Sequence, residues 1–287
     1  MMRYLCAALG VVFLVCLSFG FAFSQEIMVN AQGEVIQRTD KGSVNWTTRE
    51  ICATGYSDPN QSYYAKRSAA EVVARANLLS VLEKVYITSE RTVGMGLMVE
   101  DIRKEQVAGI LAHSYLLDPV TRPDGVMEVK ACKTIGSDLN ELLQPYAEKD
   151  TGKKFEPAEV VVEKPVAPVS EKYTGLIIDA RGKGAKPAMS PKVLVEDSDQ
   201  VVYGIGQVDR NFAIQSGLTG YAGTVDKAKN NDRVGNNPLI VKVKRVQGKN
   251  KVDFVISKED AVKIYQSDIR QGKDSFLKQC RVVIVVG

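Results

Sequence analysis

The sequence predicts an α+β fold of two domains, each a mostly antiparallel or mixed sheet with packed helices, joined by a proline-containing extended linker. Length is the first reason, because 287 residues exceed a typical single domain. Composition is the second: apolar residues make up 45% and charged residues 25%, the shares of a globular protein with buried cores. The third reason is a segment, residues 148–172, in which prolines interrupt a run without helical period.

Residues 1–24 have the features of a secretory signal. Arg3 supplies a positive charge, and the chain carries no further charge until Glu26. The residues between them are mostly apolar, and small side chains stand three positions and one position before Gln25. This pattern predicts cleavage between Ser24 and Gln25 during export.

Two other fates of this leader remain open. An uncleaved anchor is one, because an apolar run over residues 4–23 is long enough to span a bilayer. Lipid attachment at Cys16 is the other, although Val15 stands where a lipid-modified cysteine needs a small neighbour. In each case we expect an exported protein, located in the periplasm or associated with the outer membrane.

The first domain is predicted at residues 44–147. A strand over 51–55 ends in a turn, and a long helix follows over 61–84. The inner face of that helix is predicted from residues that recur every three or four positions: Ala65, Ala69, Val72, Ala76 and Leu79. Because most of these are alanines, we expect the helix to lie close against a sheet.

The rest of the first domain continues with a strand over 85–88 and a shorter helix over 99–111. Residues 114–120 lead into a Pro-Asp-Gly turn, and the returning residues 127–132 alternate apolar with polar side chains. That alternation predicts the second strand of a hairpin, with one buried face and one wet face. A short helix over 138–143 closes the domain.

Residues 148–172 are predicted to be the linker. Pro157, Pro165 and Pro168 interrupt a stretch rich in Glu, Lys and Val, which favours an extended chain. The valines at 160–162 could instead form an edge strand. Because few contacts should cross such a linker, we expect the two halves to fold independently.

The second domain, residues 173–287, begins with a buried strand over 173–180 and a glycine-rich segment. Further elements follow in order: strands over 192–196 and 201–204, a largely helical stretch over 209–230, and a hairpin of strands 239–246 and 252–256. Ser257 and Asp260 have the spacing of a capping box, which predicts the start of a helix. The last residues, 281–287, are a continuous apolar run, which predicts a strand buried on both faces in the centre of a sheet.

Basic residues gather in the second domain. Residues 173–287 carry a net charge of +7, whereas residues 25–172 carry −4. Five of the basic residues cluster on the predicted hairpin: Lys242, Lys244, Arg245, Lys249 and Lys251. Such a cluster suits an anionic glycan or lipid, and the alternative is a solvated face. A nucleic-acid partner is not predicted, because no aromatic side chains interleave with these residues as a single-strand platform needs.

No catalytic residue, metal ligand set or cofactor motif is predicted. His113 is the only histidine in the sequence, which excludes a site that needs two, and we interpret it as structural. Asp179 and Arg181 stand at the end of a predicted strand, where ligands gather in open α/β sheets. A structural ion pair is the main interpretation of these two residues, and a hydrolase that uses Asp179 is the alternative.

Three cysteines follow the leader. The predicted alternation directs Cys52 and Cys132 toward the wetter side of their strands within one domain. If the two strands are neighbours, export would allow a disulfide between these cysteines. The alternative is three unpaired cysteines in packed positions, and Cys280 is expected to stay a thiol next to the terminal strand.

Short stretches of the first domain carry a family resemblance: residues 51–55 (ICATG), 65–70 (AKRSAA), 74–76 (ARA) and 78–83 (LLSVLE). They resemble the LPP-twenty family of bacterial outer-membrane lipoproteins, and they are similar to the N-terminal domain of the flagellar assembly protein T. The resemblance covers residues 44–143. Residues 173–181 and 280–286 look like the C-terminal region of longer members. The chain departs from the lipoprotein members in the residue that precedes Cys16.

The resemblance implies a non-catalytic structural or assembly component of the bacterial envelope. We therefore expect a partner among envelope or outer-membrane protein complexes, with a flagellar complex as one candidate. Two alternatives remain: the hydrolase that uses Asp179, and a module that binds an anionic glycan or lipid through the basic hairpin at residues 242–251. The sequence leaves the oligomeric state open.

Overall fold

A computed structural model describes residues 26–99, 101–159, 162, 171–269 and 271–287. The predicted signal segment, with its cleavage position between Ser24 and Gln25 and the lipidation candidate Cys16, lies outside the described residues. Val160 and Val161 also lie outside the described residues. The alternative of an edge strand at residues 160–162 therefore stays a prediction. None of the helices in the described part of the chain is long and apolar enough to cross a bilayer.

The first domain is built on a seven-stranded antiparallel sheet in the order β1-β2-β3-β4-β7-β5, with β6 also paired to β7. The strands are β1 (Glu26–Val29), β2 (Val35–Arg38), β3 (Gly42–Asn45), β4 (Glu50–Tyr56), β5 (Tyr115–Leu116), β6 (Val120–Thr121) and β7 (Met127–Thr134). β1 and β2 precede residue 44, so the sheet begins earlier than the predicted domain. Each of these two strands has only four residues, too few for a sustained alternation in the sequence.

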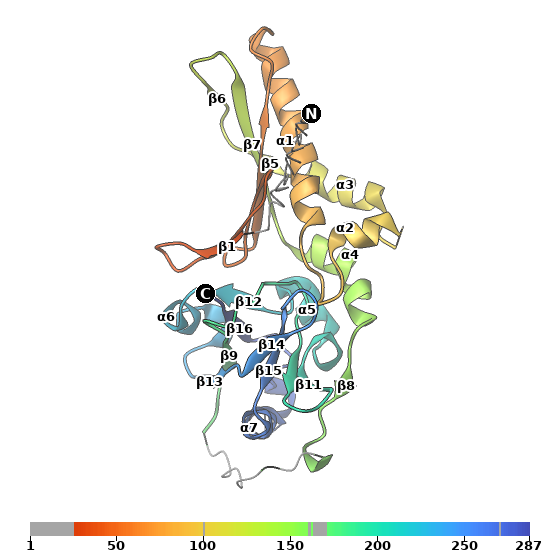
Figure 1. Cartoon of the computed structure of the whole chain (residues 1–287), viewed down its shortest axis with the longest axis vertical. Helices are drawn as coiled ribbons and strands as arrows, with labels where there is room; N and C mark the ends of the chain where they lie inside the picture. The colour runs from red at the N-terminus through yellow and green to blue at the C-terminus, as the bar shows by residue number, and fades with distance from the viewer. Residues whose placement is uncertain (1–25, 100, 160–161, 163–170, 270) are drawn as a thin grey trace, which may run out of the picture.

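Helix α1 (Tyr63–Glu83) covers one face of this sheet, over β4 and β7 (Figure 1). The approach is close at Gly55, where an added Cβ would lie 2.9 Å from the Cα of Ala74 and closer still to the carbonyl oxygen of Ala70. The buried residues of the helix are Ala70, Ala74, Leu78, Val81 and Leu82. Small residues on both elements therefore let helix and strand touch through their backbones.

The predicted inner face of α1 is wrong. Ala65, Val72 and Ala76, which belong to that predicted face, are exposed. The helix carries small or apolar residues on two opposite faces, so sequence period alone does not choose between them. The choice is made by the sheet, because the alanines at 70 and 74 fit over Gly55.

Three shorter helices complete the first domain: α2 (Val93–Met98), α3 (Lys104–Ala112) and α4 (Ser137–Glu148). α2 and α3 lie beside the C-terminal half of α1 and leave its N-terminal half without a covering helix (Figure 1). Of the predicted helix over 99–111, only the part from Lys104 onward is helical, as α3, and α2 ends just before the predicted range. α4 runs past its predicted end at 143, with Pro145 inside it.

The N-terminal part of the predicted linker is structured. β8 (Lys153–Lys154) pairs with β11 of the second domain, and Phe155 next to it is only 3% exposed. The short helix η1 (Pro157–Glu159) follows. The chain therefore crosses between the domains just after α4, before the proline-rich stretch. A single buried aromatic among lysines and glutamates gave no periodic signal of this.

The second domain contains two sheets. One is mixed, in the order β14-β15-β10-β11-β8, and the other is parallel, in the order β12-β16-β9-β13. The strands are β9 (Gly175–Asp179), β10 (Val193–Val195), β11 (Gln200–Tyr203), β12 (Gly220–Ala222), β13 (Pro238–Lys242), β14 (Arg245–Gln247), β15 (Asp253–Ile256) and β16 (Val282–Val285). β16 lies between β12 and β9 and is buried on both faces, which confirms the central position predicted for the terminal run.

The helical elements of this domain are α5 (Arg210–Ser216), α6 (Val225–Lys229), α7 (Lys258–Ile269), η2 (Ile205–Gln207), η3 (Asp232–Val234) and η4 (Gly272–Asp274). Ser257 caps α7 as predicted, but Asp260 accepts from the Ser257 hydroxyl and not from its backbone N–H as in a full capping box. The backbone N–H of Asp260 donates to Ser257 Oγ at 3.1 Å, and that hydroxyl donates to the Asp260 carboxylate at 2.9 Å. These bonds satisfy a backbone donor that the helix itself leaves without a partner.

The strand predicted over 239–246 is divided between the two sheets. β13 belongs to the parallel sheet, where the N–H of Val243 still donates to the carbonyl of Asp179. One residue later the N–H of Lys244 donates to Val255, and β14 continues in the mixed sheet. Continuous alternation hid the crossing, because each half of the strand keeps one buried and one wet side.

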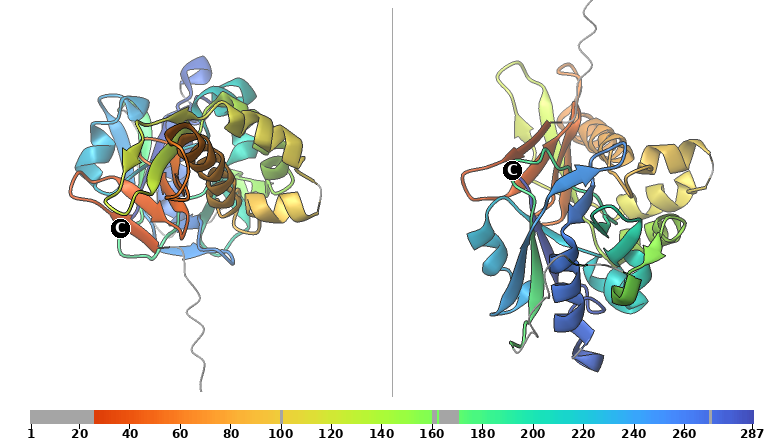
Figure 2. Two further views of the ribbon diagram at one scale, coloured as in Figure 1. Left: turned by 90° about the horizontal axis from the view of Figure 1, so that it is seen from above. Right: turned by 60° about the horizontal axis from the view of Figure 1, so that its bottom comes forward.

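The two domains share one continuous hydrophobic core, so the expectation that few contacts join them is wrong. The rings of Trp46 and Tyr221 meet edge to face with centroids 5.5 Å apart. Tyr86 packs with Ala188 and Val252. The further views show the sheet and helices of the first domain seated on the second (Figure 2). The architecture is α+β, with an antiparallel sheet in one domain and a mixed and a parallel sheet in the other.

Candidate functional site

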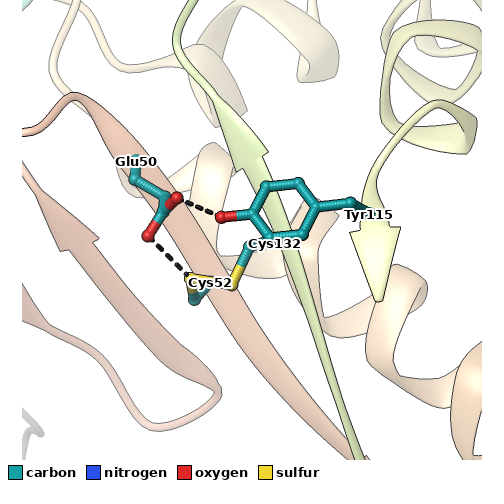
Figure 3. Close-up of a disulfide and its surroundings, with 4 residues drawn as sticks. All are labelled: Glu50, Cys52, Tyr115 and Cys132. Atoms are coloured by element: carbon teal, nitrogen blue, oxygen red, sulfur yellow. Dashed lines mark hydrogen bonds between the residues drawn. A yellow bond between two sulfur atoms is a disulfide. The ribbon is translucent and has the colours of Figure 1, made fainter. Parts of the chain in front are cut away.

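Cys52 and Cys132 are joined by a disulfide (Figure 3). The register of β4 and β7 places the two residues directly opposite each other, with Cα atoms 4.2 Å apart. A backbone hydrogen bond joins residue 135 to residue 49, and another joins residue 57 to residue 127. The cysteines thus occupy a non-hydrogen-bonded position, where opposing side chains come closest in an antiparallel sheet.

Tyr115 and Glu50 cover the disulfide on the sheet face opposite α1 (Figure 3). The Tyr115 hydroxyl donates to the Glu50 carboxylate, and this hydrogen bond raises the pKa of Tyr115. A Glu50 oxygen also lies 3.5 Å from Cys52 Sγ. The cysteines are buried, although their face of the sheet is the wetter one.

Glu50, Cys52 and Cys132 place three ligand-type atoms within 4.8 Å of one another. Such a group can hold a metal ion when the sulfurs are thiolates. Here both sulfurs are used in the disulfide, and a disulfide sulfur has no thiolate charge to offer. The cluster therefore fits a covalent clamp between two strands better than a metal site.

The first domain exposes most of the large apolar side chains found on the described surface. Eleven of fourteen lie there: Tyr56, Tyr63, Tyr64, Val72, Val73, Met95, Met98, Val99, Tyr115, Leu117 and Val120. Tyr64 is 82% exposed and Met98 is 85% exposed. Two of these side chains contact a charged group: the Arg122 guanidinium lies 4.5 Å from the ring centroid of Tyr56, and the Tyr115 hydroxyl donates to Glu50.

The outward side of α1 forms one continuous part of this surface. We call Ala65, Ala69, Val72 and Ala76 the α1 outer face, because at 100° per residue they lie opposite the buried residues. The charged residues of this half of the helix stand on its flanks or toward the sheet. The sequence did carry this signal, but we interpreted it as the inner face.

The basic hairpin residues are all exposed, but they do not form a free hairpin. Lys242 ends β13, and Arg245 begins β14. The turn between β14 and β15 lies against the first domain, where the Asn250 amide donates to the carbonyl of Ser89 at 2.8 Å. The structure thus separates Lys242 and Lys244 from a turn that serves as a contact between domains.

Asp179 and Arg181 form an ion pair with two hydrogen bonds, of 2.8 and 2.7 Å. These bonds hold the pKa of Asp179 below its ordinary value. Among the described residues that line the five principal cavities, Asp179 is not present. His113 is exposed, with its Nδ1 2.9 Å from the carbonyl oxygen of Gly109.

Arg49 and Arg233 form a contact that the sequence did not reveal. Both guanidiniums donate to the carbonyl of Ser216 at the end of α5, and Arg233 also donates to Gly217 and Cys280 at 3.0 and 2.8 Å. Burial, with the charge of Arg233, lowers the pKa of Arg49 to about 10. One arginine from each domain thus binds the carbonyl groups at the C-terminus of α5, the negative end of the helix dipole.

A cavity of about 630 Å³ lies in the second domain, between the edge of the mixed sheet and α7. Its walls come from β11, from Phe155 after β8, from the C-terminal half of α7 and from residues 275–278. No single stretch of sequence contains these residues together. Sequence periodicity could therefore not indicate the cavity.

Comparison with curated proteins gave no match. A family model described as Treponema pallidum Tp0624, second domain, matches residues 175–287. The match begins at the first residue of β9 and excludes β8 and Phe155, which the structure also places in this domain. It covers less than half of the chain, and it shows that the second domain, from β9 to the end, is similar to the second domain of that Treponema pallidum protein.

Proposed function

We propose that the chain is a non-catalytic structural or assembly factor of a bacterial envelope, and that its first domain binds the partner protein. The observation that carries the proposal is the concentration of exposed apolar side chains on that domain. Exposed apolar side chains gathered on one domain favour an interaction site there. The resemblance of residues 44–143 to the LPP-twenty family and to the flagellar assembly protein T supports the same role.

The α1 outer face is the part of this surface best suited to binding. Alanine side chains let a partner approach the helix backbone closely, and Val72, 64% exposed, supplies apolar area. Exposing a polar helix face to water would cost less free energy than exposing this apolar one. The apolar outward face is therefore explained by a partner that covers it.

The two alternative functions have less support. The carboxylate of Asp179 is already bound by Arg181, so no observation favours a hydrolase. The turn of the basic hairpin is bound to the first domain, which leaves Lys242, Lys244 and Arg245 as separate exposed charges. We therefore keep the envelope assembly role, with a flagellar complex as one candidate partner.

Site-specific photo-crosslinking in the native envelope tests this proposal. A photoreactive residue at position 72 should capture a defined partner, whereas the same residue at exposed position 183 should not. Ala76→Glu should abolish the crosslink, because it places a charge in the apolar interface. The matched control is Ala158→Glu, an exposed alanine of η1, outside the first domain.

Both glutamate variants should change the free energy of unfolding by no more than about 0.5 kcal/mol, since both sites are exposed. A crosslink at position 72 that survives Ala76→Glu would argue against the α1 outer face. Equal capture at positions 72 and 183 would argue against a specific partner on the first domain.

A further inference from the structure

The cavity between β11 and α7 has the size and lining of a ligand site. Its volume of about 630 Å³ lies within the range of pockets that enclose small molecules. α7 forms one wall, and the strand edge at β8 and β11 forms the other. The cavity lies in the second domain, away from the α1 outer face, and it is independent of the proposed assembly role.

The floor of this cavity is apolar and aromatic. Phe155, Val201 and Leu277 are buried there. The rings of Phe155 and Tyr265 meet edge to face, with centroids 5.9 Å apart. Burying an apolar chain against such a floor is favourable, because both surfaces leave water.

The carboxylates at the cavity are already occupied within the protein. Asp268 accepts hydrogen bonds from the Ser275 hydroxyl at 2.7 Å and from the backbone N–H of Leu277 at 3.0 Å. Asp209 caps α5 and accepts from the backbone N–H groups of its first turn. Neither carboxylate therefore needs a ligand cation.

The lysines at the cavity are differently placed. Lys154 and Lys278 line it, and both side chains are exposed. Burial raises the pKa of the Asp268 carboxyl overall, although Lys278 lies near enough to lower it through its charge. Residues 173–287 also carry a net charge of +7, which attracts anions at longer range. The two lysines are thus the exposed charges at the cavity mouth, whereas the two carboxylates are bound by hydroxyl and backbone N–H groups of the protein.

We propose that this cavity binds a single acyl chain with an anionic head group. The chain lies on Phe155 and Tyr265, and the head group lies between Lys154 and Lys278. The apolar floor selects the chain, and the two exposed ammonium groups select the charge of the head. This is a binding site, and no chemical step is part of it.

Calorimetric titration of the full-length exported protein tests the site. Three single-chain probes of nearly equal tail length, each used below its micelle concentration or solubility limit, differ in their heads: decanoate, decanol and decyltrimethylammonium. Decanoate should bind most tightly and the trimethylammonium compound least. The double variant Lys154→Gln, Lys278→Gln should weaken decanoate binding by roughly threefold to tenfold, as expected for two exposed ion pairs, and should leave decanol binding unchanged.

Two further variants separate the site from general charge effects. Ile269→Glu places a negative charge on the exposed rim of the cavity, so it should abolish decanoate binding and improve binding of the trimethylammonium probe. Lys183→Gln removes an exposed lysine elsewhere in the domain and should change nothing. Equal affinity for all three probes, or decanoate binding unaffected by the double lysine variant, overturns the proposal.

A last arm distinguishes a single chain from a membrane surface. Anionic phosphatidylglycerol vesicles are titrated against the same variants. If the lysine variants weaken vesicle binding while decanoate does not bind at all, the lysines bind a lipid surface, and the cavity proposal fails.

Discussion

Asp179 and Arg181 form an ion pair whose contribution to stability should depend on pH. The Asp179 side chain is largely buried, whereas Arg181 is about half exposed, which limits the value of the pair to less than about 1 kcal/mol. Asp179→Asn should lower the free energy of unfolding by this amount at pH 7. Because the folded-state pKa of Asp179 is lowered, the difference should shrink below about pH 4 and vanish below the folded-state pKa.

Urea unfolding of wild type and variant at pH 7 and in acid measures this difference. Asp199→Asn is the control, because Asp199 is exposed and forms no ion pair within the described residues. A difference that grows in acid would contradict the ion-pair interpretation. Loss of cellular function at an unchanged unfolding midpoint would instead support the hydrolase alternative.

Residue-scale chemistry was predictable only where a local pattern carried it. Alternation in two strands was enough to set Cys52 and Cys132 on the same side, although adjacency of those strands was not visible. Arg49 and Arg233 gave no signal, because they lie far apart in the sequence and their partners are backbone carbonyls. Backbone acceptors look the same at every residue, so only the folded chain reveals which arginine reaches them.

At the scale of elements, the contact between β4 and α1 should be sensitive to one methyl group. Gly55→Ala would place a Cβ against the backbone at Ala70 and Ala74, so helix and sheet must move apart. We expect a loss of about 1–3 kcal/mol in the free energy of unfolding, as for other overpacked sites. Thermal and urea unfolding measure it.

Gly109→Ala is the matched control in the same domain. Gly109 lies within α3, and nothing stands within 4 Å of an added Cβ there. The same substitution should therefore raise stability by about 0.5–1 kcal/mol through helix propensity. Two effects of the same sign would show that α1 does not lie against Gly55.

Elements were recognised better than their neighbours were. Sequence period located the long helix within two residues at either end, but it assigned the wrong face because both faces are apolar. The strand over 239–246 was also recognised, yet its division between two sheets depends on Val243 and Lys244 bonding to different strands. Hydrophobic periodicity indicates that a face is apolar, but it does not indicate which element packs against that face.

At the scale of the whole molecule, residues before the predicted second domain should stabilise it. β8 adds an edge strand to the mixed sheet, and Phe155 is buried against Tyr265. A fragment of residues 150–287 should therefore be more stable than one of residues 173–287, by about 1.5–3 kcal/mol for the buried ring. Urea unfolding of both fragments measures this difference.

Phe155→Ala in the longer fragment should remove most of the gain. Equal stability of the two fragments would instead support a domain boundary at residue 173.

The fold class was predictable because composition and hydrophobic periodicity describe each domain separately. The shared core was not, since contacts such as Trp46 with Tyr221 join residues that no local pattern connects.

The disulfide also sets how far the chain can lengthen under mechanical load. Cys52 and Cys132 are 80 residues apart in sequence and adjacent in space, so pulling on the termini cannot extend the chain between them. At about 3.3–3.6 Å per residue, the segment between them could add some 260–290 Å to the length of the extended chain, but only after the disulfide is reduced. α1 and the residues of its outer face lie inside this closed loop. A force along the backbone is therefore carried by the disulfide and does not act on these residues. A partner bound to the α1 outer face would stay bound while the rest of the chain is stretched.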